Sequence, residues 1–504
     1  MESLGLLVKG FSNAISVDNL LYAFVGSVLG TLVGILPGIG PTAGIALLLP
    51  LVAFLPPTST IIILAAVYYG SMYGGSTTAI LVNMPGEAAS VVTALDGYQL
   101  AKQGRAGSAL AISAIGSFVA GTIGLLGLSF AAPLLADMAL AFGPPEYFGL
   151  VMLSLTVVVG LFGKSILKGA IAGMLGFLFT LPGLDPISGI PRFTFGSGVF
   201  YGGIDYVSAV VGLFAIAEVL ESAEQSIYAI CEKVGRWWPS KEELRTCIGT
   251  MIRATGIGFF LGLLPGCTPA VASFIAYDIE KRVSKHPEKF GSGVLEGVAA
   301  PETANNAITS SGFIPLFSLG IPPTPALAVL LGALIIYGLQ PGPLLFQQHS
   351  DFVWTVIASM YIGNVMLLIL NLPLVSLWAR IAMIPYRFLA PMILVLCFIG
   401  TYSIRNRMFD VIIAVFFGLL GYGMKKVGFP VAPMVMTLIL GPMLESNLGH
   451  SLSMGRGNLG IFLRRPITLG FLVFAIFIIA FSLYRQYRST QKWDMIRESS
   501  AEVE

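Results

Sequence analysis

The chain has 504 residues, of which 56% are hydrophobic and 11% charged, and its net charge at pH 7 is +2. A soluble domain carries roughly 25% charged residues, so this composition excludes a soluble globular protein, and the high hydrophobicity excludes a disordered chain. The balanced charge gives no indication of a nucleic-acid partner, which leaves an integral membrane protein embedded in a lipid bilayer.

Continuous apolar runs, rather than the alternating segments of a barrel, fill the sequence from residue 20 to residue 484. Many have the length of a membrane helix, about 20 residues. They predict an all-α polytopic membrane protein with about a dozen transmembrane segments, some of them broken or re-entrant. The runs cover residues 20–36, 42–55, 58–82, 107–134, 147–163, 165–181, 206–220, 254–277, 293–338, 352–378, 383–400, 408–423, 429–445 and 466–484.

Two short motifs indicate an internal duplication. The sequence GILPGIGPT begins at Gly34 and GLLPGCTPA begins at Gly262, so the offset is 262 − 34 = 228 residues. The same offset, without a gap, aligns residues 76–80 (STTAI) with residues 304–308 (ANNAI). Duplicated halves with matched helix breaks are typical of secondary transporters. The alternative is chance agreement between Pro and Gly residues, which are common in membrane helices.

Further similarity between the halves follows a short insertion, where PGEAA at residues 85–89 resembles PPTPA at residues 322–326. The predicted organisation is a first membrane repeat at residues 15–224, a charged connecting segment at 225–249, a second membrane repeat at 250–448, an extra C-terminal membrane segment at 449–485 and an exposed polar tail at 486–504.

Each LPG motif predicts a break in a membrane helix, because proline lacks an N–H group and glycine permits positive φ. One helix is expected to end near Leu36 and the next to begin near Pro41. A helix start offers free N–H groups to a carboxylate, and a helix end offers free carbonyls to Na⁺; the alternative is a purely structural kink. The binding candidates at the two breaks are Gly38, Gly40, Pro41, Thr42, Gly266 and Thr268.

Two polar stretches lie inside membrane-length runs, at residues 68–87 and 301–312. Unpaired polar groups are costly in hydrocarbon, so such stretches indicate binding or, alternatively, interhelical hydrogen bonding. Hydroxyl, amide and carboxylate oxygens suit Na⁺, and the amide N–H groups can donate to carboxylates. The candidates are Ser76, Thr77, Thr78, Asn83, Glu302, Thr303, Asn305, Asn306, Thr309, Ser310 and Ser311, among which Na⁺ ligands are not separated from substrate ligands.

No catalytic constellation is evident elsewhere in the sequence. The three histidines are far apart, and the four cysteines form no CxxC pair. The polar segment that contains Asp96, Lys102 and Arg105 is expected to be solvated. The sequence also has no GxxxxGK[ST] loop for a nucleotide.

Three sequence stretches, GILPGIGPT, YYGSMYGGSTTAILVNMPGE and PETANNA, resemble the TctA family, the large membrane subunit of tripartite tricarboxylate transporters. The resemblance covers about residues 18–445, and Cys267-Thr268 departs from a closer copy of the first motif. It implies a small TctB-like membrane subunit and a periplasmic TctC-like binding protein as partners. It also implies a secondary mechanism driven by a cation gradient, usually Na⁺, and a substrate such as citrate, another tricarboxylate or a related organic acid.

The sequence therefore predicts a multi-pass symporter of the bacterial inner membrane, without enzymatic activity and without a cofactor apart from Na⁺ as coupling ion. A carrier for another small carboxylate is the first alternative. A membrane-embedded enzyme would need a base, nucleophile or metal cluster, and a channel would be distinguished only by flux kinetics.

Overall fold

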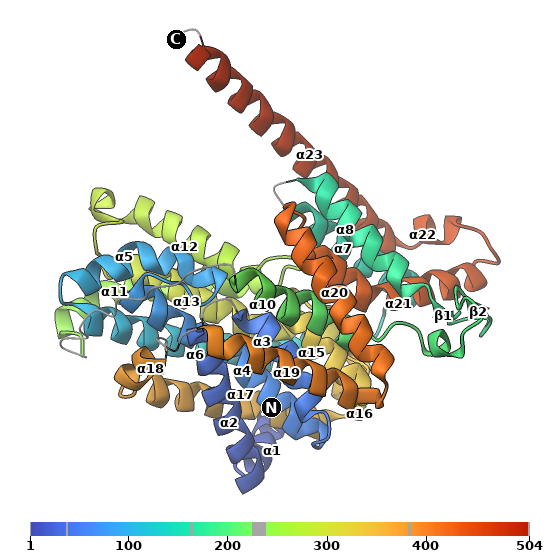
Figure 1. Cartoon of the computed structure of the whole chain (residues 1–504), viewed down its shortest axis with the longest axis horizontal. Coiled ribbons are helices and arrows are strands. Elements are labelled where there is room, and N and C mark those ends of the chain that lie inside the picture. Colours follow the sequence, from blue (N-terminus) through green and yellow to red (C-terminus); the bar gives the residue numbers. More distant parts are fainter. Residues whose placement is uncertain are drawn as a thin grey trace. The chain divides into compact units, whose positions relative to one another are not determined.

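The computed structural model describes residues 2–36, 39–161, 165–223, 238–381, 384 and 386–501. In these ranges the chain consists of helices and connecting loops, with one antiparallel pair of short strands, β1 (Gly183–Leu184) and β2 (Pro191–Arg192) (Figure 1). The predicted fold class, an all-α polytopic membrane protein, is confirmed.

The first half of the chain contains α1 (Glu2–Ala14), α2 (Val17–Ile35), α3 (Gly40–Val52), α4 (Pro57–Val82), η1 (Ala88–Ser90), α5 (Val91–Lys102), α6 (Ala106–Ala139), α7 (Pro144–Leu161), α8 (Ile166–Thr180), η2 (Gly198–Gly202), α9 (Tyr206–Val210), η3 (Val211–Ile216) and α10 (Ala217–Ser222). The second half contains α11 (Lys241–Gly262), α12 (Pro269–Val283), η4 (Pro287–Lys289), α13 (Glu296–Ser311), α14 (Phe313–Leu319), α15 (Pro325–Ile336), α16 (Pro343–Gln348), α17 (Ser350–Asn371), α18 (Val375–Ile381), α19 (Tyr386–Arg405), α20 (Met408–Lys426), α21 (Val431–Met454), α22 (Gly460–Arg464) and α23 (Pro466–Ala501).

Seven helices in the described part of the chain are long and apolar enough to cross a membrane: α2, α6, α17, α19, α20, α21 and α23. Four shorter apolar helices, α3, α7, α8 and α15, account for further predicted runs. Of the remaining runs, 58–82 forms the single helix α4. The runs 206–220, 254–277 and 293–338 are interrupted, the last of them at Gly312, where α13 and α14 meet.

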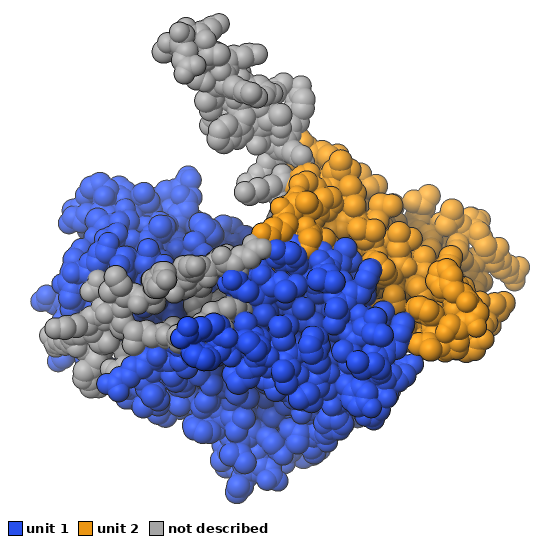
Figure 2. Space-filling model, viewed as in Figure 1, with its two compact units in different colours: residues 1–140, 207–422 blue, residues 141–206, 423–504 orange. Residues whose placement is uncertain are grey.

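The chain forms two compact units (Figure 2): unit 1 comprises residues 1–140 and 207–422, and unit 2 comprises residues 141–206 and 423–504. Each unit therefore combines segments from both predicted repeats, whose boundaries stay a prediction. In unit 2, α21 packs against α7 and α8, and α23 packs against α7. In unit 1, α2 lies along α4, and α11 lies along α13.

Small residues allow these helix pairs to pack backbone to backbone. A Cβ added to Gly30 of α2 would lie 2.8 Å from the Ala66 carbonyl oxygen, and one added to Gly258 of α11 would lie 2.9 Å from the Ala304 Cα. Close approach at glycine is typical of helix packing in membranes. As a result, α4 is buried throughout residues 59–82, and α13 is buried throughout residues 297–311.

The helix contacts also give the register between the halves. Gly34 of α2 faces the Ser71 carbonyl, and its counterpart Gly262 of α11 faces the Ile308 carbonyl. The two contacted residues are separated by 308 − 71 = 237 positions, although the two glycines are separated by 228. The second half therefore carries nine additional residues (237 − 228 = 9) between its α2-like and α4-like helices.

The ends of α4 and α14 confirm the offset of 237 residues. Asn83 closes α4 in the left-handed conformation with φ of 55°, and Gly320 closes α14 with φ of 72°, where 320 − 83 = 237. After each cap, an N–H bonds back six residues at 3.2 Å, from Met84 to Thr78 and from Ile321 to Pro315.

The gapless alignment of residues 76–80 with 304–308 is therefore wrong. The insertion precedes α13 instead of following it, because a surface connection absorbs extra residues at far lower cost than a packed helix. Thr78 and Asn306, although separated by 228 residues, are consequently not equivalent positions.

Candidate functional site

The first predicted helix break is present in unit 1. α2 ends at Ile35 and α3 begins at Gly40, which has φ of 59°. Pro37 and Gly38 lie outside the described residues. Pro41 and Thr42 occupy the first turn of α3, as expected, but Thr42 does not cap it, since the cap position is Ile39.

The second break follows the same plan with a stronger cap. α11 ends at Gly262 and α12 begins at Pro269, and Thr268 accepts a hydrogen bond from the Val271 N–H at 3.4 Å. Gly266 has φ of 81°, and its N–H donates to the Pro323 carbonyl at 2.9 Å. The break is thereby fixed to the segment that follows the polar stretch of the same half.

Each break helix also packs against the other half. α3 contacts α15, and α12 contacts η1. Both contacted elements follow a polar stretch: α15 comes after α13 and α14, and η1 comes after α4. The two breaks and the two polar stretches are thus brought into one interlocked part of unit 1.

Glu302 is completely buried, on the part of the chain where α13 packs against α4, α5 and α6. Its carboxylate accepts hydrogen bonds from the hydroxyls of Ser76 on α4 and Thr93 on α5. Ser113 on α6 provides a further hydroxyl donor. All three donors are neutral, so they orient the carboxylate without compensating its charge.

Glu87 lies in the turn between α4 and η1 and is 8% exposed. The side-chain amide of Asn305 donates to Glu87 Oε1 at 3.0 Å. The other amide atom, Asn305 Oδ1, is buried and has no hydrogen-bond partner within the described ranges. A carboxylate next to an unsatisfied amide oxygen is the type of donor set that hard cations prefer.

The contact between Asn305 and Glu87 has a counterpart related by the repeat. Tyr68 and Thr324 occupy the equivalent positions (305 − 68 = 237 and 324 − 87 = 237), and Tyr68 Oη lies 3.3 Å from Thr324 Oγ1. One pair contains a carboxylate and the other contains only hydroxyls. The site is therefore pseudo-symmetric in position but asymmetric in charge.

Several candidates on α13 form hydrogen bonds to their own helix or to α6. Asn306 donates to Ser117 Oγ of α6 at 2.7 Å and to the Glu302 carbonyl at 3.1 Å. The hydroxyls of Thr309 and Ser310 donate to carbonyls four residues earlier, which neutralises a hydroxyl in a membrane helix. Their contacts support the packing alternative more than a binding role.

The remaining candidates have mixed environments. Ser311 bonds to a carbonyl three residues earlier at 3.4 Å, and Thr78 does the same at 3.2 Å. Thr77 is buried, whereas Asn83 is exposed at the end of α4. Thr303 Oγ1 is buried without a hydrogen-bond partner among the described residues and faces Gly116 of α6.

Asp96 corrects an expectation, because it is fully buried instead of solvated. Its carboxylate accepts from the Tyr277 hydroxyl at 2.8 Å and from the N–H groups of Gly291, Gly293 and Val294 at 2.8 to 3.0 Å. The N–H groups of the loop before α13 thus provide the hydrogen bonds that water was expected to provide. The same bonds connect α5 to the second half of the chain. Lys102 and Arg105 are exposed, as expected.

Sequence reasoning missed four residues of this cluster: Glu87, Thr93, Ser113 and Ser117. Glu87 carried a usable signal, since it is an acidic residue at the end of a membrane-length polar stretch. The three hydroxyl residues carried none, because serine and threonine are common in membrane helices.

Comparison with known proteins identifies a family for most of the chain. The family described as the tripartite tricarboxylate transporter TctA family matches residues 20–436. An uncharacterized 52.8 kDa protein in the TAR-I ttuC' 3' region of Agrobacterium vitis is 45% identical over 500 residues, covering 99% of this chain and 100% of that protein. An uncharacterized protein in the TAR-II ttuC' 3' region of the same organism is 44% identical over 232 residues, covering 46% of this chain and 96% of that protein. No solved structure matches the chain.

Proposed function

Because the chain belongs to the tripartite tricarboxylate transporter TctA family, we propose that it imports citrate, another tricarboxylate or a related organic acid by cation symport, with Na⁺ as the coupling ion. It is a multi-pass membrane protein of a transporter family. The proposal extends to a bacterial inner-membrane location, a TctB-like small membrane subunit and a periplasmic TctC-like binding protein that delivers the substrate.

The observation that carries the coupling proposal is the buried pair of carboxylates, Glu87 and Glu302. Their hydrogen-bond partners are hydroxyl, amide and backbone groups, and in the described part of the chain neither forms an ion pair with a lysine or arginine. Two neighbouring carboxylates in a low-dielectric interior cannot both remain charged without a compensating cation or proton. A coupling cation that binds here would meet that requirement.

The Asn305 amide favours a metal cation over a structural role alone. Its N–H donates to Glu87, which leaves its buried carbonyl oxygen available as a ligand. Oxygen ligands of mixed charge are typical of hard-cation sites. The substrate carboxylates would be received at the starts of α3 and α12, where free N–H groups favour anions.

The test is uptake of labelled citrate into proteoliposomes that contain the chain, the small membrane subunit and the binding protein. We expect accumulation with an inward Na⁺ gradient and none when K⁺ replaces Na⁺ on both sides at a clamped membrane potential. Equal uptake in K⁺ would contradict Na⁺ coupling, and accumulation driven by an inward pH gradient alone would assign the carboxylate pair to protons.

Two further arms address the substrate and the partner. Unlabelled dicarboxylates and tricarboxylates in excess rank the substrates by competition. Omission of the binding protein is expected to abolish high-affinity uptake, so full-rate uptake by the membrane subunits alone would contradict the proposed partnership.

A further inference from the structure

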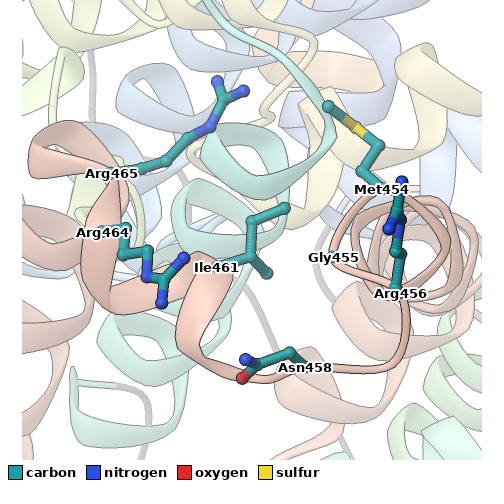
Figure 3. A pocket seen from close by; sticks show the side chains of 7 residues that line it. All are labelled: Met454, Gly455, Arg456, Asn458, Ile461, Arg464 and Arg465. Carbon is teal, nitrogen blue, oxygen red and sulfur yellow. The ribbon is translucent and has the colours of Figure 1, made fainter.

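A second polar site lies in unit 2, in the loop that joins α21 to α23. It is a pocket of about 470 Å³. Figure 3 shows its lining side chains, Met454, Gly455, Arg456, Asn458, Ile461, Arg464 and Arg465. Three of the seven residues are arginines, and no acidic residue lines the pocket. This part of the chain takes no part in the carboxylate cluster of unit 1.

The three arginines are not equivalent. Arg465 reaches the buried carboxylate of Glu146 on α7 at 3.2 Å, so part of its charge is already compensated. Arg456 and Arg464 form no ion pair within the residues that the structure describes. Two guanidinium groups that line one pocket favour an anion there, and guanidinium groups bind phosphate through paired N–H donors.

The backbone after α21 shapes the loop that carries the pocket residues. Arg456 has φ of 51°, an unfavourable conformation for a residue with a side chain, and Gly457 follows with φ of 79°. The Asn458 side chain accepts the Gly460 N–H at 2.7 Å and closes the turn. The Gly457 N–H donates to the Leu452 carbonyl at 2.8 Å, so the positive φ values belong to the cap that ends α21, and this cap places Arg456 at the end of the helix.

The membrane context selects among anionic ligands. The pocket directly precedes the span Pro466–Tyr484 of α23, whose most apolar window is only 11% buried within the chain. Large apolar side chains, including Val473, Phe477 and Phe481, are exposed along this span. A ligand with a phosphate at the pocket and hydrocarbon chains along α23 would satisfy both surfaces, and basic pockets at membrane helix ends are known to accept lipid headgroups.

We propose that the pocket of Arg456, Arg464 and Arg465 binds the phosphate of an anionic phospholipid whose acyl chains lie along α23. Free phosphate would make the same contacts with the arginines, but it has no hydrocarbon chains to cover the exposed apolar side chains of α23. The lipid would position α23 and the α21–α23 loop on α7 through Arg465 and Glu146.

Native mass spectrometry of the delipidated membrane complex in detergent tests the proposal. Dioleoylphosphatidylglycerol is expected to bind about tenfold more tightly than dioleoylphosphatidylcholine. Both lipids carry the phosphate, but only phosphatidylcholine brings a quaternary ammonium group, which the arginines repel, so only phosphatidylglycerol offers them a net negative headgroup. The wild-type comparison needs no variant, so equal binding of the two lipids would by itself overturn the proposal.

The double variant Arg456→Gln with Arg464→Gln is expected to lose the preference for phosphatidylglycerol while the complex remains monodisperse. Arg282→Gln removes an exposed arginine of α12 in unit 1 and serves as the matched control, with the preference unchanged. An unchanged preference in the double variant would place the lipid elsewhere and refute the site. Displacement of phosphatidylglycerol by millimolar inorganic phosphate, with equal thermal stabilisation by phosphate alone, would identify a soluble-anion site and refute the lipid assignment.

Discussion

The Asn305 amide donates to the Glu87 carboxylate at 3.0 Å across the boundary between the two halves of the chain. The equivalent pair, Tyr68 and Thr324, makes the same crossing at 3.3 Å with two neutral hydroxyls. The contact is therefore present in both halves, with a carboxylate in one pair and only hydroxyl groups in the other. The charged copy is the one that we assign to the coupling ion.

Asn305→Ala should reduce uptake about tenfold or more, because a hydrogen bond to a charged group is worth about 1.5–3 kcal/mol and no other side-chain donor to Glu87 is present among the described residues. Tyr68→Phe, the repeat-related control, removes a neutral bond and should cost only a few fold. Initial uptake rates at equal amounts of protein measure both. Equal losses in the two variants would argue against a special role for the charged copy.

Glu302→Gln should abolish gradient-driven accumulation but keep the fold, because glutamine has nearly the same shape and retains an acceptor for Ser76 or Thr93. Substrate exchange between equal internal and external pools should persist in this variant. The control Glu288→Gln alters an exposed side chain in the loop after α12 and should leave both activities unchanged. Normal Na⁺-driven accumulation by Glu302→Gln would remove Glu302 from the coupling site.

Gly258→Ala and Gly256→Ala form a matched pair on α11. A Cβ at Gly258 would collide with the backbone of Ala304, whereas nothing lies within 4 Å of a Cβ at Gly256. Overpacking costs about 1–3 kcal/mol, and alanine is favoured over glycine in a helix by about 1 kcal/mol. Gly258→Ala should therefore lower the melting temperature of the purified protein, and Gly256→Ala should raise it or leave it unchanged. A lower melting temperature for both would disprove the register of α11 on α13.

Asp96→Asn should destabilise the protein more than it changes the activity of the protein that remains folded. The carboxylate accepts hydrogen bonds from three N–H groups and one hydroxyl, and an amide group would bring its own N–H donors toward them. The expected cost is about 2–4 kcal/mol, since buried bonds to a charged group are lost. Asp278→Asn, which breaks an exposed pair with Arg282, is the control and should cost less than about 1 kcal/mol. Thermal unfolding in detergent compares the two.

The loop after α8 should lose protection in acid. Backbone hydrogen bonds from Ser188 and Ile187 hold the pKa of the Asp185 carboxyl below its usual value, with a smaller effect from Arg192. Because the pKa is lower in the folded state, the stabilisation is complete above about pH 4. It is lost as the pH falls through the lowered value. Amide exchange of residues 183–192, corrected for intrinsic rates, should show this loss in the wild type. Asp185→Asn should show weaker protection without the pH dependence.

The helix breaks could be predicted because proline and glycine have local effects: α2 and α11 end, and α3 and α12 begin, where the LPG motifs require it. Glu302 and Asn305 could be selected because polar groups in an apolar run are costly. The register of α13 could not be predicted from the sequence. STTAI and ANNAI are similar locally, but the true register is set by the packing of Gly34 and Gly262, which depends on contacts between residues far apart in the sequence. The burial of Asp96 escaped prediction because backbone N–H donors leave no trace in the side-chain sequence.

The bonds of Asp96 to residues 291–294 have a mechanical consequence. They fasten α5 of the first half to the start of α13 in the second half, while α12 packs on η1 and α3 on α15. These contacts therefore link the two halves of the sequence inside unit 1. A transport cycle that moved the two sequence halves apart would have to break these bonds, which makes a hinge at the segment that connects the halves costly.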